Sequence, residues 1–327
     1  MKTAIIYHSS LEHLGLFKDI KYSDDYILCQ AGFSELHNIS KKILKKISLS
    51  KIGACFQIER YSWYTYAKLL NQINEIDEMI IFNGALNYLE NGFLFECRKQ
   101  NHNIKISLYL IDSLMASSPM LLQVRDKINN YPWDTIYTFD PIDAKKNGFI
   151  YRGFDYYSAQ NRNEILSQKT LTDLYFIGGL KGNRTEYIKE VFEYVYKKGG
   201  KCDFNLLPYS ATEYEEAYEG INYIRGGWIP YADVLKGIAK SKCIFECLQK
   251  GQTGASLRYF EAICYNKKLI STNHYIKEFP FYNSKYMKII DDVEEIDMEW
   301  LTNDLVVDYG YDNRFSPKNL KGHERIK

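Results

Sequence analysis

Two polar, glycine-containing segments in the second half of the chain each follow an apolar stretch and run into an amphipathic one. The first is FIGGLKGNR from Phe176, and the second is KGQTGASLRYFEA from Lys250. Glycine lets a backbone approach a ligand closely, and a helix start offers N–H groups and the positive end of the helix dipole. Each segment also carries an arginine. Together they predict a site for an anionic ligand such as a phosphate.

The first segment offers Gly178 and Gly179 for close approach, with Lys181 and Arg184 as cations. We expect both glycines to lie in the turn after a strand, and a helix to begin near Arg184. The spacing is neither the G-x-G-x-x-G of a dinucleotide site nor that of a P-loop. A tight turn with a solvated lysine is the alternative interpretation.

The second segment offers hydrogen-bond donors in several directions at the start of a helix. Glu261, about one turn further on, can accept from a pair of hydroxyl groups such as a ribose diol. In the alternative, Ser256 is a helix cap and Arg258 pairs with a nearby acid. The predicted ligand residues before Glu261 are Gln252, Thr253, Gly254, Ser256 and Arg258.

Two side chains in the first half stand where apolar stretches end. Asp112 follows IKISLYL, and His8 ends the first apolar stretch of the chain. A base that takes a proton from a substrate hydroxyl must lie within hydrogen-bond reach of that hydroxyl. Asp112 is the first candidate for this base and His8 the second. The alternatives are a helix cap for Asp112 and a structural role for His8.

Asp140 and Asp143 lie close together in TFDPIDA, where a metal site would need acids. The D-P-I-D spacing and the helical pattern that follows favour turn and cap roles instead. We therefore predict no required metal. Positive charge and a helix dipole would then meet the negative charge of an anionic ligand.

Short apolar stretches alternate with amphipathic ones through both halves, which predicts an α/β fold with parallel sheets and helices on both faces. A polar and aromatic stretch from Tyr151 separates the halves. We expect two Rossmann-like domains, 1–155 and 156–327, that face a cleft, with the tail packing back on the first domain. Ligands of such sheets bind beyond the carboxyl ends of the strands. The first half has predicted helices over 35–48, 64–76, 86–99 and 120–129.

Composition excludes some classes of protein. The 327 residues carry a net charge of +1, which provides no field to attract nucleic acid. A basic stretch from Lys41 is either the solvated face of a helix or a docking face for anionic lipid. Seven irregularly spaced cysteines indicate reduced thiols and a cytoplasmic protein. The apolar run at the N-terminus is too short for a signal peptide or a membrane span.

The second half resembles the donor-binding half of bacterial GT-B glycosyltransferases, in particular those of capsule, exopolysaccharide or lipopolysaccharide assembly. These often show the pattern Q-x-G-x-T-x-R-x-x-E-A-x-x-x-x-K-K-L-I-T-x-N. The first half resembles them in YLIDS, WDTIYTFDPIDAKKNGF and YYS. The pattern is followed approximately by Gln249, Gly251, Thr253, Arg258, Glu261, Ala262 and Lys267 to Ile270.

The resemblance implies transfer of a sugar from a nucleotide-diphosphate donor, a UDP-sugar, to a glycan or lipid-linked acceptor at the cytoplasmic face of the inner membrane. It gives Arg184 a diphosphate contact and Glu261 the ribose contact. Thr253 stands where larger retaining families have another glutamate, so the stereochemistry stays open. The rival interpretations are a non-catalytic nucleotide-binding protein and a GT-B-like sugar-nucleotide epimerase. We expect Arg258→Ala to lower turnover at least about tenfold with the fold intact.

Overall fold

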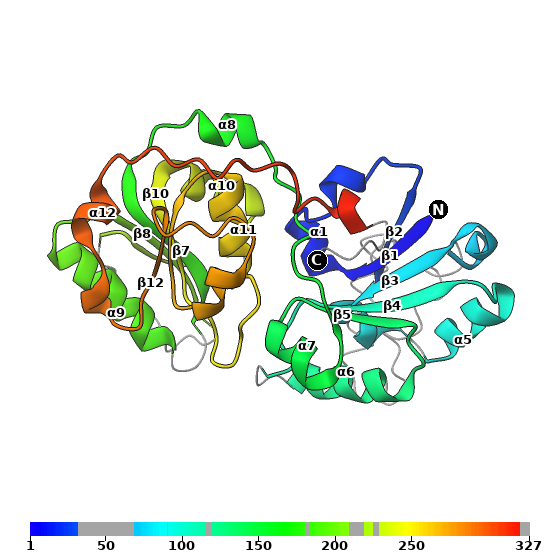
Figure 1. Ribbon diagram of the computed structural model, residues 1–327. Coiled ribbons are helices and arrows are strands. Elements are labelled where there is room, and N and C mark those ends of the chain that lie inside the picture. The colour runs from blue at the N-terminus through cyan, green and yellow to red at the C-terminus, as the bar shows by residue number, and fades with distance from the viewer. Residues whose placement is uncertain are drawn as a thin grey trace. The chain divides into compact units, whose positions relative to one another are not determined.

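The computed structural model describes residues 1–31, 69–89, 91–115, 119–180, 184–208, 219–224 and 229–320. The predicted helix over 35–48, much of that over 64–76, the basic stretch from Lys41 and Lys181 lie outside these ranges. The described chain divides into two compact units (Figure 1). The first is Met1–Ser158 with the described tail from Ser316, and the second is Ala159–Phe315.

The first unit holds a six-stranded sheet in the order β2-β1-β3-β4-β5-β6, with every neighbouring pair parallel. The order reverses between β1 and β3. The strands are β1 (Thr3–His8), β2 (Tyr26–Ala31), β3 (Glu78–Phe82), β4 (Lys105–Leu110), β5 (Thr135–Thr138) and β6 (Ile150–Tyr151). The helices are α1 (Ser9–His13), η1 (Lys18–Ile20), η3 (Ile73–Glu75), η4 (Asn83–Tyr88), α5 (Asn91–Gln100), α6 (Pro119–Asn130), α7 (Pro141–Asn147) and, in the tail, η8 (Pro317–Leu320).

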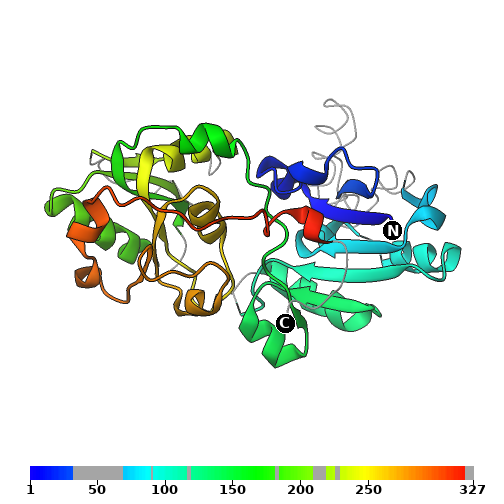
Figure 2. The same cartoon turned by 45° about the horizontal axis from the view of Figure 1, so that its top comes forward.

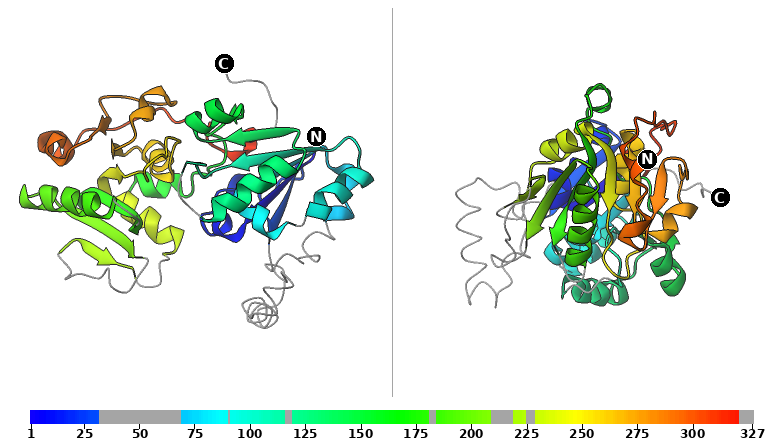
Figure 3. Two further views of the ribbon diagram at one scale, coloured as in Figure 1. Left: turned by 90° about the horizontal axis from the view of Figure 1, so that it is seen from below. Right: turned by 90° about the vertical axis from the view of Figure 1, so that its left-hand side faces the viewer.

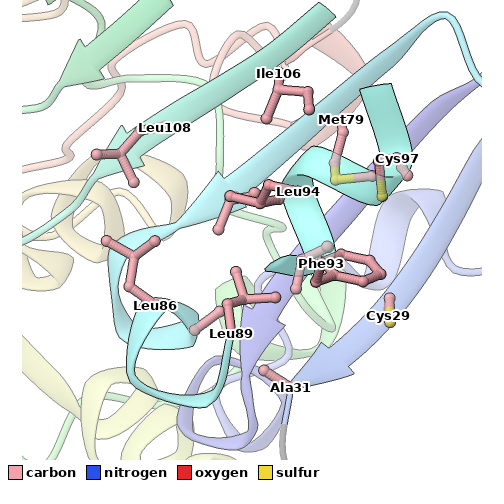
Figure 4. Packing of buried hydrophobic residues seen from close by; sticks show 14 of the residues in the cluster. Cys29, Ala31, Met79, Leu86, Leu89, Phe93, Leu94, Cys97, Ile106 and Leu108 are labelled. Atoms are coloured by element: carbon pink, nitrogen blue, oxygen red, sulfur yellow. The ribbon is translucent and has the colours of Figure 1, made fainter. Parts of the chain in front are cut away.

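Central strands of this sheet are buried on both faces, which is why they form unbroken apolar stretches in the sequence. One face packs against η4 and α5 (Figure 4). Leu86, Leu89 and Phe93 meet Ile106 and Leu108 of β4 there. This packing fixes where β1, β3 and β4 end, and so positions the polar residues that follow them.

The second unit holds a six-stranded parallel sheet in the order β12-β11-β10-β7-β8-β9. Read from β9, this is the 3-2-1-4-5-6 order of a Rossmann sheet, with its switch point between β7 and β10. The strands are β7 (Thr172–Leu180), β8 (Cys202–Pro208), β9 (Ile221–Tyr223), β10 (Ser241–Glu246), β11 (Lys268–Ser271) and β12 (Met287–Ile289). The helices are α8 (Arg162–Leu166), α9 (Arg184–Lys197), α10 (Tyr231–Lys240), α11 (Leu257–Cys264), η6 (His274–Glu278), η7 (Val293–Glu295) and α12 (Met298–Thr302).

The two faces of the second sheet carry different helices. Ile188 and Phe192 of α9 and Leu301 of α12 pack with Phe204 and Phe245 on one face. Figure 3 shows the backbone from two further sides. On the other face α10 and α11 contact β7, β10 and β11. This double covering confirms the α/β class predicted from the sequence. No helix in the described ranges is long and apolar enough to cross a membrane.

Candidate functional site

The carboxyl edge of the second sheet carries an arginine at its switch point. β7 and β10 pair with each other, and successive strands leave them in opposite directions. Arg184 begins α9, and its guanidinium donates to Gly179 O in β7 and, over 3.1 Å, to Cys247 O just after β10. A fixed positive charge therefore bridges the two strand ends where sheets of this order bind anionic ligands.

Gly178 and Gly179 lie inside β7, so the prediction that they form the turn after a strand is wrong. The ladder between β7 and β8 continues to Leu180. A Cβ on Gly178 would lie 2.9 Å from Cζ of Phe176, so glycine leaves room for that ring. The prediction of a helix start near Arg184 is confirmed.

The loop between β10 and α11, residues 247–256, has an exposed tip. Gln252 N donates to Gln249 O over 3.0 Å, which closes a four-residue turn. Gly251 is the third residue of that turn and has φ +87°, a value that favours glycine. Lys250 and Gly251 are exposed and Gln252 is half-buried, so part of Gln252 is open to solvent.

The base of the 247–256 loop is tied to the residues after β11. Leu248 N donates to Thr272 Oγ1 over 3.1 Å. Asn273 Nδ2 donates to the carbonyls of Thr253 and Gly254 over 3.2 and 3.3 Å. Thr253 and Gly254 are both buried. These bonds hold the loop at two points on either side of its exposed tip.

A buried carboxylate holds the end of the same loop. Glu246 ends β10 and is 1% exposed, and it accepts from the hydroxyls of Ser256 and Ser271. The Ser256 hydroxyl also accepts from Arg258 N over 3.1 Å and caps α11. Burial raises the pKa of Glu246, while its bonds to the two serines oppose that rise. The structure thus gives Ser256 the cap role that was the alternative interpretation.

Arg258 and Glu261 pair with each other inside the second unit. Arg258 Nη1 lies 2.9 Å from Glu261 Oε2, and Glu261 Oε1 accepts from Tyr231 Oη over 2.9 Å. Glu261 is fully buried, and the Arg258 side chain is 14% exposed. Burial raises the pKa of Glu261 to about 7, against the opposing effects of Arg258 and Tyr231. The nearby acid of the alternative interpretation is therefore Glu261.

This ion pair corrects one expectation. Arg258→Ala would leave a buried carboxylate without its cation, and breaking a buried pair in this way destabilises proteins strongly. From the ion pair we now expect Arg258→Ala to destabilise the fold rather than leave it intact. The contact of Glu261 with a ribose stays a prediction.

The two lysines that follow α11 have structural partners. Lys267 Nζ donates to Ala239 O near the end of α10 over 2.9 Å, and burial lowers its pKa to about 8. Lys268 is 1% exposed, and its Nζ donates to three carbonyls between residues 300 and 303 at the end of α12. Cations suit the carbonyl ends of helices. This accounts for the K-K of the sequence pattern without a ligand.

The carboxyl edge of the first sheet places both candidate bases near one buried amide. His8 ends β1, Asn83 follows β3 and Asp112 follows β4, and these three strands are neighbours (Figure 2). Asn83 is fully buried; its Oδ1 accepts from Ile111 N over 2.9 Å and its Nδ2 donates to Asp112 Oδ2 over 2.8 Å. A Cβ on Gly84 would lie 3.2 Å from Cβ of His8.

Asp112 is exposed at this edge and has no cap role. The following helix, α6, begins at Pro119, well beyond it. Asn83 instead fixes one oxygen of the carboxylate, and an exposed carboxylate held in one orientation suits proton abstraction.

His8 is committed to its own helix. Its Nδ1 accepts from Ser10 N over 3.3 Å, so that His8 caps α1, and the same atom lies 2.9 Å from Ser10 Oγ. Burial lowers the pKa of His8 and favours the neutral ring. A neutral ring that accepts at Nδ1 carries its proton on Nε2 and is a donor there. This geometry favours Asp112 over His8 as a base.

Asp140 has the cap role that the sequence favoured, whereas Asp143 holds a distant part of the chain. Asp140 caps α7 by accepting from the N–H groups of Ile142 and Asp143. Asp143 is buried, and its Oδ2 accepts from Leu114 N over 2.6 Å. In the described residues, no three His, Cys, Asp or Glu side chains gather as a metal ion would need.

A cavity of about 400 Å³ lies beside the loop that carries Asp112. Leu114 and Met115 of that loop line it, together with Arg125 of α6 and Lys146 and Phe149 from α7 and the residues after it. Its size is that of small-ligand sites, which are commonly apolar with a few polar groups.

No protein-family model matches the chain, and a search of curated proteins finds no match. Solved structures show distant similarity. One is an α-glucosyltransferase in complex with UDP and a 13-mer DNA, with 11% identity, a TM-score of 0.46, and coverage of 83% of this chain and 79% of that one. Another is the glycosyltransferase SnogD from Streptomyces nogalater, with 11% identity, a TM-score of 0.42 and coverage of 93% and 91%.

A third is Phytolacca americana UGT2 complexed with UDP-2fluoro-glucose and pterostilbene, with 11% identity, a TM-score of 0.43 and coverage of 89% and 85%. At such identities and TM-scores these likenesses decide neither the activity nor the ligand of this chain.

Several residues of these sites were not predicted from the sequence. Asn83, Glu246, Thr272 and Asn273 each follow or end an apolar strand, which is the one local signal that could have found them. Their partners lie between two and 29 residues away, and most are 19 or more away.

Proposed function

We propose that this protein is a glycosyltransferase that moves a sugar from a nucleotide-diphosphate donor to a glycan or lipid-linked acceptor in bacterial surface polysaccharide synthesis. The expected donor is a UDP-sugar. The resemblance of the second half to bacterial GT-B enzymes supports this proposal, as does the geometry of the two carboxyl edges.

The single observation that carries the proposal is Arg184 at the switch point of a Rossmann-ordered sheet. Its guanidinium bridges the end of β7 and Cys247, the first residue of the 247–256 loop after β10. A diphosphate leaving group develops negative charge in the transition state, and a preorganised guanidinium stabilises that charge. The second unit would therefore hold the donor, with Gln252 at the loop tip as a further contact.

The first unit would hold the acceptor and supply the base. Asp112 would take the proton of the acceptor hydroxyl as that oxygen attacks the anomeric carbon, and the diphosphate would leave with the bonding electron pair. The cavity lined by Leu114 and Met115, which follow Asp112 in the chain, also has Arg125 and Lys146 in its lining and is our candidate for the acceptor site. We propose that no metal is required and that the enzyme works at the cytoplasmic face of the inner membrane.

A thermal-shift screen against UDP, GDP, dTDP and CMP sugars tests the donor site. A specific ligand raises the melting temperature by mass action, so a shift of several degrees with one nucleotide class names the donor. Arg184→Ala is the matched variant, and it should lose most of that shift. A wild-type protein that none of these nucleotides stabilises contradicts the proposal.

Slow release of free sugar from the matching donor then separates the candidate functions. A transferase releases sugar to water, and the rate should persist in EDTA if no metal is required. A binding protein releases none, and an epimerase instead converts the donor into its epimer.

A further inference from the structure

Three residues at the end of β11 and directly after it contact the loop that follows the neighbouring strand β10. Ser271, Thr272 and Asn273 are consecutive, and each contacts a different part of the 247–256 loop or the residue before it. The loop follows β10, and β11 pairs with β10 in the sheet. One short segment thus reaches the whole length of its neighbour loop.

The contacts hold the loop near its start at Leu248, then at Thr253 and Gly254, and at its last residue, Ser256. Thr272 Oγ1 accepts from Leu248 N, and Asn273 Nδ2 donates to two carbonyls at Thr253 and Gly254. Ser271 shares the Glu246 carboxylate with the serine that caps α11. The exposed tip lies between these points and contains the turn closed by Gln252 N and Gln249 O.

Asn273 is itself fixed, which makes it a rigid support. It is 3% exposed, its backbone N donates to Ser271 Oγ over 2.9 Å, and its Oδ1 accepts from Tyr275 N over 3.0 Å as the cap of η6. Its amide oxygen is therefore used by the helix and its amide nitrogen by the loop. A side chain held at both ends transmits its position to the loop carbonyls.

We propose that Thr272 and Asn273 are positioning residues that set the nucleotide affinity of the 247–256 loop without touching the ligand. This inference rests on the proposed function, because it names the loop as part of the donor site. Residues held by buried hydrogen bonds keep a binding loop in one geometry and lower the ordering entropy lost on binding.

Thr272→Val and Thr272→Ser form a matched pair that tests the first contact. Valine has almost the same shape but cannot accept from Leu248 N, whereas serine can. We expect Thr272→Val to weaken binding of the nucleotide found in the thermal-shift screen about five- to tenfold, the effect of one hydrogen bond. Thr272→Ser should bind the nucleotide as the wild type does. Binding is measured by calorimetry well below the melting temperature.

Asn273→Asp tests the second contact separately from the helix cap. Aspartate still caps η6 but cannot donate to the two loop carbonyls. We expect weaker nucleotide binding together with faster amide exchange across residues 248–256, and unchanged exchange in η6. Buried Asn273 could also affect folding, so Thr272→Val with its serine control keeps the test valid.

Nucleotide binding and amide exchange together separate failure of this inference from failure of the proposed function. If the wild type binds nucleotide and Thr272→Val binds it equally well, the inference is overturned and the function stands. If the wild type binds no nucleotide, the proposed function fails. Unchanged exchange of the loop in Thr272→Val overturns the inference in either case.

Discussion

At the scale of single residues, few of the charged groups predicted as ligands are available at the proposed sites, and the proposed chemistry depends on those few. Arg258 and Glu261 look like ligand residues in the sequence, but they form an ion pair beneath the 247–256 loop. Arg184 lies instead at the switch point, and Asp112 is exposed at the edge of the other sheet. Residue type and spacing predict which region matters better than they predict which side chain meets the ligand.

Arg258→Ala should destabilise the protein by about 3 to 5 kcal/mol, because it leaves Glu261 buried and unpaired. Arg258 also opposes the pKa rise of Glu246, so the variant removes a cation from two buried acids. Urea denaturation measures the loss. Arg258→Met combined with Glu261→Gln should recover much of it, and a double variant as unstable as Arg258→Ala contradicts the pairing.

The pH dependence of stability should carry the signature of Glu261. Its pKa is about 7 in the folded protein and 4.5 ordinarily, so the folded state binds the proton more tightly. The contribution of Glu261 to the free energy of unfolding is fully present below about pH 4.5 and is lost as the pH rises through about 7. The stability lost in this way is roughly 3 kcal/mol.

Urea denaturation between pH 5 and 8 tests this sign. Glu261→Gln cannot ionise and should lose less stability over that range than the wild type does. Curves that fall in parallel for the two proteins would show that Glu261 does not titrate in this window.

Asp112→Asn should lower turnover about 100-fold or more, because an amide cannot take the acceptor proton. The amide oxygen can still accept from Asn83, so the fold should be unaffected. The exposed Asp24→Asn is the control and should keep full activity. Sugar transfer is measured with the donor named by the thermal-shift screen. Full turnover in Asp112→Asn would return His8 to first place as the base.

At the scale of elements, the strands could be predicted because parallel strands buried on both faces must be apolar throughout. The amphipathic stretches likewise predicted α9, α10 and α11. The error at Gly178 and Gly179 has a physical reason, since glycine usually breaks a strand but here makes room for Phe176 within it.

The hydrogen-bond networks of the sites could not be predicted in the same way. Asn83 and Asp112 are 29 residues apart, and Glu246 and Ser271 are 25 apart. No local period relates such pairs, because the sheet order brings them together. What the sequence does predict is the edge at which they meet, since all of them lie at or after strand ends.

Lys268 shows how one side chain can hold an element in place. Its Nζ donates to carbonyls at the end of α12, so Lys268→Met should leave these groups without a donor and cost at least about 2 kcal/mol. Amide exchange should quicken in α12 before it does so elsewhere. The exposed Lys277→Met is the control. Unchanged protection of α12 in Lys268→Met would contradict the capping role.

At the scale of the whole molecule, the described chain forms two compact units, and its tail from Ser316 packs as part of the first unit. Arg152 Nη2 donates to the carbonyls of Asn319 and Leu320, and Ser316 Oγ donates to Asp19 over 2.6 Å. Leu320 is fully buried. The stability of the first unit therefore depends on residues that follow the entire second unit in the sequence.

Separate unfolding transitions should reveal this arrangement in a calorimeter. Leu320→Ala removes a buried side chain, which typically costs about 2 to 5 kcal/mol, and should lower the transition of the first unit. Saturating nucleotide should raise the other transition, because the proposed donor site lies in the second unit and a ligand stabilises the folded state that binds it. The exposed Val306→Ala is the control and should change neither. If Leu320→Ala lowered the nucleotide-sensitive transition and left the other unchanged, the tail would stabilise the nucleotide-binding unit instead.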